Sequence, residues 1–151
     1  MNGSTDLDSN SVVDIHRSIA ADEQTVLVVE DEPSVQTFIE LLLVSSGYRV
    51  ICASDGIEGL AAFMEHRHAL SVVITDLKMP RLDGVGMVGA IRKEDRNVPI
   101  VVVSGNLDLR SVTELGHLNV NALLNKPFSM AALLKTITEA SGRDRIPVPG
   151  Q

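Results

Sequence analysis

The chain has 151 residues, of which 44% are hydrophobic and 3% aromatic, with no tryptophan. This length suits one domain, and this hydrophobic fraction is too high for a disordered protein, so we expect a folded domain with an aliphatic core. The formal net charge of −7 provides no basic surface for nucleic acid or for an anionic membrane. Direct binding to DNA or RNA and to membranes is therefore not expected.

Residues 1–24 form an extension ahead of the first predicted strand. They are mostly polar and acidic, which does not suit a secretory signal, and no apolar run in the chain reaches the length of a membrane span. Ser11 and Asp14 have a capping-box spacing beside Val12, Ile15 and Ile19, which would suit one short amphipathic helix. We expect this extension to be either flexible or a short helix, and the protein to be soluble and cytoplasmic.

From Thr25 onward, short β-branched runs alternate with longer stretches of helical periodicity. We predict strands at 26–29, 49–53, 70–75, 100–103 and 122–124, and helices at 34–46, 56–67, 84–95, 109–118 and 130–140. Residues 141–151 contain Pro147, Pro149 and Gly150 and are typical of a tail or linker. The sequence thus predicts one domain over residues 25–140.

The predicted helices and strands carry the apolar patterns of an α/β fold. In the first helix Phe38, Leu41, Leu42 and Ser45 fall on one face, and in the last helix Leu133, Leu134, Ile137 and Ala140 do so. Residues 72–74 and 100–103 are apolar on both sides, as in the interior strands of parallel sheets. We predict a doubly wound, five-stranded parallel sheet of order 2-1-3-4-5, with helices on both faces.

Chemically useful residues follow four of these strands. Glu30 and Asp31 follow the first, Asp76 the third, Ser104 the fourth and Lys126 the fifth. The carboxyl ends of parallel strands share one edge, and in the order 2-1-3-4-5 the first and third strands are neighbours. Three carboxylates would then lie close enough to repel, and a divalent cation with oxygen ligands, Mg²⁺ or Mn²⁺, would remove the conflict.

A carboxylate beside such a cation can act as a nucleophile toward a phosphoryl group. Asp76 would form an aspartyl-phosphate, while the ammonium group of Lys126 and the hydroxyl group of Ser104 would stabilise the transferring oxygens. This chemistry relies on positioning and charge and needs no histidine base. The histidines, which are His16, His66, His68 and His117, show no metal-ligand spacing and are expected at the surface.

The segment 72–80 followed by Asp83 and Gly84 resembles the phosphoacceptor segment of response-regulator receiver domains. All five signature positions of that family are filled in order, and the resemblance covers about residues 24–140. They are Glu30, Asp31, Asp76, Ser104 and Lys126, the last followed by Pro127 and Phe128.

The resemblance implies a role for each of these positions. Asp76 would be phosphorylated, and Asp31, Asp76 and the backbone carbonyl of Lys78 would bind the metal directly. Glu30 would hold a metal-bound water, and a cis peptide before Pro127 would aim Lys126 inward. It also implies a histidine kinase or histidine phosphotransfer protein as donor, an unidentified downstream protein as target, and a monomer or a phosphorylation-dependent dimer. Such a domain catalyses its own phosphorylation, could also dephosphorylate itself, and is a signalling module and not a metabolic enzyme.

Two features depart from the family pattern or compete with it. Leu123 stands three residues before Lys126, where receivers often carry a switch Tyr or Phe. Gly84, Gly86 and Gly89 match the dinucleotide-binding pattern G-x-G-x-x-G, but that function needs its first glycine directly at the strand end. Here residues 78–83 intervene, so we do not predict a nucleotide site.

Two alternative functions remain open from the sequence. A receiver-like module could signal by binding alone, without phosphorylation, an option that Leu123 favours and the complete acidic site does not. A Mg²⁺-dependent phosphatase acting on a metabolite could also use Asp76, but no insertion is long enough for a substrate-enclosing cap. Cys52, the only cysteine, lies in an apolar run and is expected to be a small core residue.

Overall fold

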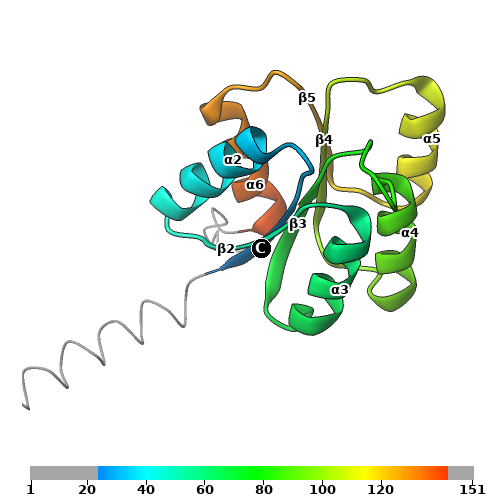
Figure 1. The fold of residues 1–151 in the computed structure, drawn as a ribbon, viewed down its shortest axis with the longest axis horizontal. Helices are drawn as coiled ribbons and strands as arrows, with labels where there is room; N and C mark the ends of the chain where they lie inside the picture. Colours follow the sequence, from blue (N-terminus) through cyan, green and yellow to red (C-terminus); the bar gives the residue numbers. More distant parts are fainter. Residues whose placement is uncertain (1–23, 143–151) are drawn as a thin grey trace, which may run out of the picture.

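A computed structural model of the protein describes residues 24–142, and the helix considered for residues 11–19 lies outside this range. Five strands and five helices alternate within residues 24–142 (Figure 1). The strands are β1 (Thr25–Val29), β2 (Arg49–Ala53), β3 (Leu70–Thr75), β4 (Ile100–Ser104) and β5 (Ala122–Asn125). The helices are α2 (Pro33–Ser45), α3 (Gly56–His66), α4 (Gly84–Glu94), α5 (Leu109–His117) and α6 (Met130–Ser141). Every element lies within two residues of its predicted bounds.

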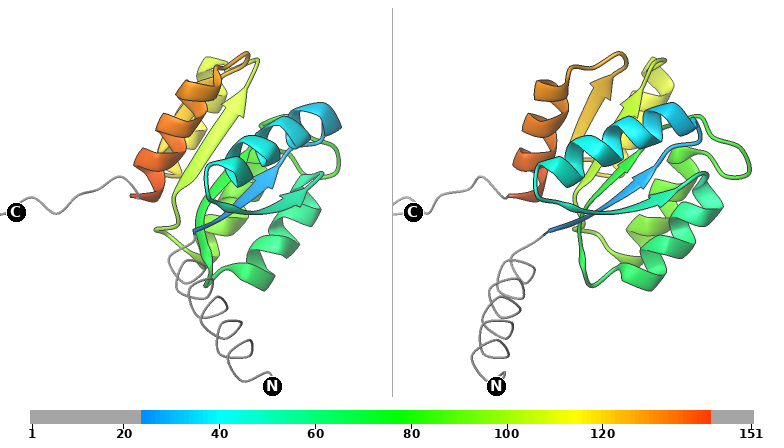
Figure 2. Two further views of the ribbon diagram at one scale, coloured as in Figure 1. Left: turned by 90° about the vertical axis from the view of Figure 1, so that its left-hand side faces the viewer. Right: turned by 60° about the vertical axis from the view of Figure 1, so that its left-hand side comes forward.

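The strands form one parallel sheet in the order β2-β1-β3-β4-β5, as predicted. Helices α2 and α6 cover one face of this sheet, and α3, α4 and α5 cover the other (Figures 1 and 2). Successive residues of β1 point to opposite faces, so Val26 and Val28 pack beneath α2 while Leu27 and Val29 pack beneath α3 and α4. The sheet is therefore apolar on both faces, and the polar residues gather at its carboxyl edge.

The face of α2 that packs on the sheet differs from the prediction. The buried residues are Ile39, Leu42 and Leu43, whereas Phe38 is 39% exposed and Leu41 is 64% exposed. The predicted face was rotated because α2 is apolar around much of its circumference, so periodicity alone did not define one side. In α6 the prediction was correct, with Leu133 and Ile137 fully buried and Leu134 and Ala140 partly buried against the same core cluster.

Local signals explain where the helices begin. Asp55, Asp83, Asp108 and Ser129 each accept a hydrogen bond from the backbone N–H three residues later, at the starts of α3, α4, α5 and α6. Pro33 opens α2, where a missing N–H costs nothing. Within residues 24–142, no helix is both long and apolar enough to cross a membrane.

Candidate functional site

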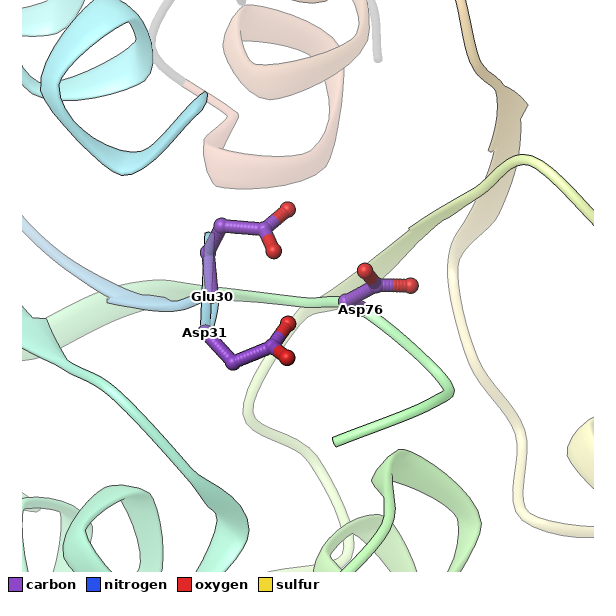
Figure 3. A group of neighbouring side chains, drawn as sticks. All are labelled: Glu30, Asp31 and Asp76. Carbon is purple, nitrogen blue, oxygen red and sulfur yellow. The ribbon is translucent and has the colours of Figure 1, made fainter. Parts of the chain in front are cut away.

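Three carboxylates meet at the carboxyl edge of the sheet, where β1 and β3 are paired (Figure 3). Glu30 and Asp31 follow β1, Asp76 follows β3, and one oxygen from each lies within 4.8 Å of the others. The backbone fixes this arrangement, because the N–H of Asp76 donates to the carbonyl of Val29 at 3.1 Å. Sheet pairing thus brings together the three acids predicted from the sequence.

The three carboxylates differ in their exposure to solvent. Glu30 is 1% exposed and Asp76 is 9% exposed, whereas Asp31 is exposed. The cluster is therefore closed on its inner side and open beside Asp31, so that water or another ligand can enter there.

Lys126 enters the cluster from the end of β5. Its Nζ donates to Glu30 Oε1 at 2.6 Å and to Asp76 Oδ2 at 2.9 Å, while the other oxygen of Asp76 accepts from the N–H of Leu77 at 2.7 Å. The backbone N–H of Lys126 donates to the carbonyl of Ser104, and the peptide bond to Pro127 is cis, as predicted. One ammonium group faces three carboxylates, so the cluster keeps a net negative charge.

Burial and pairing shift the protonation equilibria inside the cluster. Burial raises the pKa of Glu30, with a smaller raising effect from Asp76, and outweighs the opposing hydrogen bonds from Lys126 and Glu32. Burial tends to lower the pKa of Lys126, but its hydrogen bonds to Glu30 and Asp76 outweigh this and raise it. Lys126 is therefore firmly protonated at neutral pH and supplies a fixed positive charge next to Asp76.

The sequence profile of the response regulator receiver domain matches residues 26–138, most of the chain. The chain belongs to this family. A probable transcriptional regulator, ycf27 of Porphyridium aerugineum, is 33% identical over 135 residues, which cover 85% of this chain and 55% of that protein. The transcriptional regulatory protein PrrA of Mycobacterium tuberculosis is 35% identical over 112 residues, covering 74% of this chain and 47% of that one. The chain thus spans about half the length of these relatives.

Solved receiver structures agree with the fold. A response regulator receiver domain from Clostridium thermocellum superposes with a TM-score of 0.75 and 32% identity, covering 80% of this chain and 95% of that one. The receiver domain of the sensor histidine kinase PA1611 from Pseudomonas aeruginosa superposes with a TM-score of 0.72 and 33% identity, covering 80% and 98%. That second structure has a magnesium ion coordinated in its active-site cleft.

The residues of this receiver also fit a magnesium ion. The side chains of Glu30, Asp31 and Asp76 offer carboxylate oxygens, which are the ligands that Mg²⁺ prefers. One oxygen from each lies within 4.8 Å of the others. Asp31 faces solvent, so water molecules can complete a coordination shell. The remaining negative charge around Lys126 favours a cation at this position.

Two other predicted residues lie at the same edge without joining the carboxylate cluster. Ser104 is 2% exposed, and its hydroxyl oxygen accepts a hydrogen bond from the N–H of Asn106 at 3.2 Å. Lys78 lies in the loop between β3 and α4 with an exposed side chain. Because β3 ends at Thr75 and α4 begins only at Gly84, this loop also separates the glycine pattern from the strand end, as predicted.

Sequence reasoning missed Gln36, which holds the backbone that carries the acids. Its side-chain amide donates to the carbonyls of Glu30 and Ala53, both at 3.0 Å. The N–H of Glu30 donates to the same carbonyl of Ala53, so the ends of β1 and β2 are joined twice. The only sequence signal was a glutamine one turn into α2, which is common on any helix surface.

An apolar groove lies beside Lys126, between α2 and the start of α6. It is lined by Ser34, Val35, Phe38, Lys126, Pro127 and Phe128, and the rings of Phe38 and Phe128 are 6.1 Å apart. Phe38 and Leu41 of α2, with Met130 of α6, continue this apolar surface away from the acids. The exposed residues of α2 thus border the candidate site.

Proposed function

We propose that this receiver is a phosphorylation-activated switch that accepts a phosphoryl group on Asp76 from a histidine kinase or histidine phosphotransfer protein. The observation that carries the proposal is the environment of the Asp76 carboxylate. Lys126 and the N–H of Leu77 each hold one of its oxygens, and the carboxylates of Glu30 and Asp31 adjoin it. A nucleophile, a fixed cation and an acidic metal pocket thus occupy one strand edge.

In this proposal the carboxylates of Asp31 and Asp76 and the backbone carbonyl of Lys78 would hold Mg²⁺, and Glu30 would hold a water bound to the ion. Mn²⁺, which also accepts oxygen ligands, could take the same place. The ion would neutralise charge on the phosphoryl oxygens and lower the repulsion that an anionic donor meets at this acidic edge.

The residues of the chain divide the transfer reaction between them. A carboxylate oxygen of Asp76 attacks phosphorus, the new P–O bond forms as the P–N bond of the donor phosphohistidine breaks, and the bonding electron pair remains on the histidine nitrogen. Lys126 contacts the transferring oxygens in place of its present bond to Asp76, and the hydroxyl group of Ser104 donates to another. No base is needed, because a carboxylate oxygen can attack phosphorus without first losing a proton.

A protein donor is supported by the apolar groove beside Lys126. A small-molecule donor would need only the acidic pocket, whereas the groove that contains Phe38 and Phe128 offers an additional contact surface next to the reacting carboxylate. The output would be a changed protein-binding surface on a cytoplasmic monomer or phosphorylation-dependent dimer. Leu123 is half-buried against the aliphatic core, so we propose that this change proceeds without an inward-swinging aromatic ring.

The proposal is tested by measuring intact mass after incubation with acetyl phosphate and Mg²⁺. We expect one added phosphoryl group that requires Mg²⁺, is lost in Asp76→Asn, and remains in Asp108→Asn, a matched carboxylate that caps α5. If the wild-type protein gains no phosphoryl group and does not bind beryllofluoride, the proposal is wrong and the binding-only module replaces it. Steady hydrolysis of small phosphate esters by the wild-type protein would instead support the phosphatase alternative.

A further inference from the structure

The loop between β3 and α4 contains a residue in an unusual backbone conformation. Arg81 has a φ angle of 71°, a left-handed backbone value that residues other than glycine and asparagine rarely adopt. The other non-glycine residue with positive φ within residues 24–142 is an asparagine, Asn119, for which this region is common. A glycine would fit position 81 with less strain, so the presence of arginine points to a use for its side chain.

The side chain of Arg81 pairs with a buried acid. Its Nη1 lies 3.1 Å from Oδ2 of Asp55, whose side chain is only 7% exposed. The other oxygen of Asp55 accepts the N–H of Glu58 at 2.8 Å and so caps α3. Asp55 is therefore fixed in position by its own helix, and Arg81 binds to a rigid partner across the loop.

Two close backbone contacts hold the same loop. A Cβ atom added to Gly56 would lie 2.1 Å from the carbonyl oxygen of Leu82, so the loop rests directly on the start of α3. At the base of the loop, the N–H of Gly84 donates to the carbonyl of Leu77 at 2.6 Å. The loop that carries Lys78 is thus held at its base by Leu77 and along its length by Asp55 and Gly56.

These contacts connect the two sides of the acidic cluster. Asp55 follows β2, and the carbonyl of Ala53 at the end of β2 accepts the N–H of Glu30, next to Asp31. Arg81 lies three residues after Lys78 in the loop that begins at Asp76. The ion pair between Asp55 and Arg81 therefore links the ends of β1 and β2, next to Asp31, to the loop that contains Lys78.

We propose that Arg81 and Asp55 are positioning residues that set the distance between the Lys78 carbonyl and the carboxylates, and thereby the affinity for Mg²⁺. This inference rests on the proposed function, since it assumes that the Lys78 carbonyl is a ligand. Groups that orient metal ligands without touching the metal typically change affinity tenfold or more when removed. The arginine is thus kept for the metal-binding geometry, although a glycine would suit the backbone better.

The experiment measures the Mg²⁺ dissociation constant from amide chemical shifts by NMR, since the chain has no tryptophan to report by fluorescence. Four variants are compared with the wild-type protein, and the melting temperature of each is recorded without Mg²⁺. Arg81→Gly removes the side chain and relieves the backbone, and Asp55→Ser keeps a cap for α3 while removing the charge. The double variant tests whether the pair acts as a unit. Arg67→Gln breaks the ion pair to Glu94, which joins α3 and α4 far from the acids, and is the matched control.

We expect Arg81→Gly to weaken Mg²⁺ binding by about tenfold while its melting temperature stays equal or rises. Asp55→Ser should weaken binding to a similar degree, the double variant no further, and Arg67→Gln not at all. If the wild-type protein binds Mg²⁺ and both Arg81→Gly and Asp55→Ser bind it with the same affinity, the positioning role is wrong and the proposed function stands. A wild-type protein that binds no Mg²⁺ would overturn both.

Discussion

The acidic edge around β1 and the region around α5 are held in different ways. All five residues of β1 are buried, and α2 above it buries Ile39, Leu42 and Leu43. Helix α5 buries a single residue, Leu115, and Leu109 at its start is 83% exposed. The acids of the site therefore follow a fully buried strand beneath a well-packed helix, while the helix that follows Ser104 has few apolar anchors.

Helix α5 is held instead by polar contacts at its end. Arg92 of α4 donates from Nε to the carbonyl of Leu118 at 2.7 Å and from Nη2 to that of Asn119 at 3.1 Å. Segments with few buried apolar contacts open most easily and are the ones that rearrange in switches. The comparison teaches that a firmly packed site and a helix with few apolar anchors can share one sheet edge, with Ser104 and the loop after it between them.

Two leucine truncations test this difference and should give the largest effects. Leu43 in α2 and Leu115 in α5 are both fully buried, and replacing either by alanine removes the same atoms. We expect Leu43→Ala to lower the global free energy of unfolding by about 2–5 kcal/mol. Leu115→Ala should lower it less, because α5 can open separately from the sheet, and should speed amide exchange mainly within residues 109–117.

Urea unfolding and native-state hydrogen exchange measure these two effects on the same proteins. Equal losses of global stability, with no local increase in exchange in α5, would mean that the two regions unfold as one unit. The inferred contrast in stability between the firmly packed edge and α5 would then be wrong.

Much of this architecture could be predicted from the sequence because it depends on short-range patterns. Short runs that are apolar on both sides, such as residues 72–74, are typical of interior strands in a covered parallel sheet. Residues that directly follow such strands lie at the carboxyl edge of the sheet. Together with the strand order 2-1-3-4-5, which makes the first and third strands neighbours, that rule predicted the cluster of Glu30, Asp31 and Asp76. Lys126 was placed at the same edge because it follows the fifth strand, and the resemblance to receivers added the cis peptide before Pro127, which the structure contains. Its Nζ contacts Glu30 and Asp76.

The rest could not be predicted, because it depends on contacts between segments distant in the sequence. The packing face of α2 was wrong since its residues Phe38, Leu41 and Val44 are apolar yet exposed. The pair of Arg81 with Asp55 joins two turns whose side-chain directions no periodicity defines. Such contacts require the backbone path of both loops, which a sequence pattern does not contain.

Removal of the arginine that holds α5 should have an intermediate effect. Arg92→Gln loses the bonds to the carbonyls of Leu118 and Asn119, and hydrogen bonds that involve a charged group contribute about 1.5–3 kcal/mol. We expect a loss near the lower end of this range, because Arg92 is only half-buried, and faster amide exchange at the end of α5. Arg110→Gln, which breaks an exposed pair with Glu114 inside α5, is the control and should change little. If Arg92→Gln leaves exchange in α5 unchanged, the polar contacts do not hold this helix.

The smallest expected effect concerns Cys52 on β2, whose thiol reactivity reports how well α2 covers this strand. It can be measured in the wild-type protein without any substitution. Burial raises the pKa of its thiol group to about 11 from an ordinary value of 9.0, with a further contribution from Glu40 of α2. Only the thiolate reacts with iodoacetamide, so alkylation at pH 8 should be about a hundredfold slower in the folded protein than in urea. The rate should then rise about tenfold per pH unit and level off near pH 11.

The direction of the linked stability change follows from the same shift. The folded state holds the thiol proton more tightly than the unfolded state does, so stability from this group is present below pH 9 and is lost as the pH rises toward 11. In Glu40→Gln the pKa of Cys52 should fall only partway, since burial is the larger cause. If folded and unfolded proteins react equally fast at pH 8, α2 does not cover β2 as tightly as the three buried residues of α2 indicate. The packing difference between α2 and α5 would then be smaller than the structure suggests.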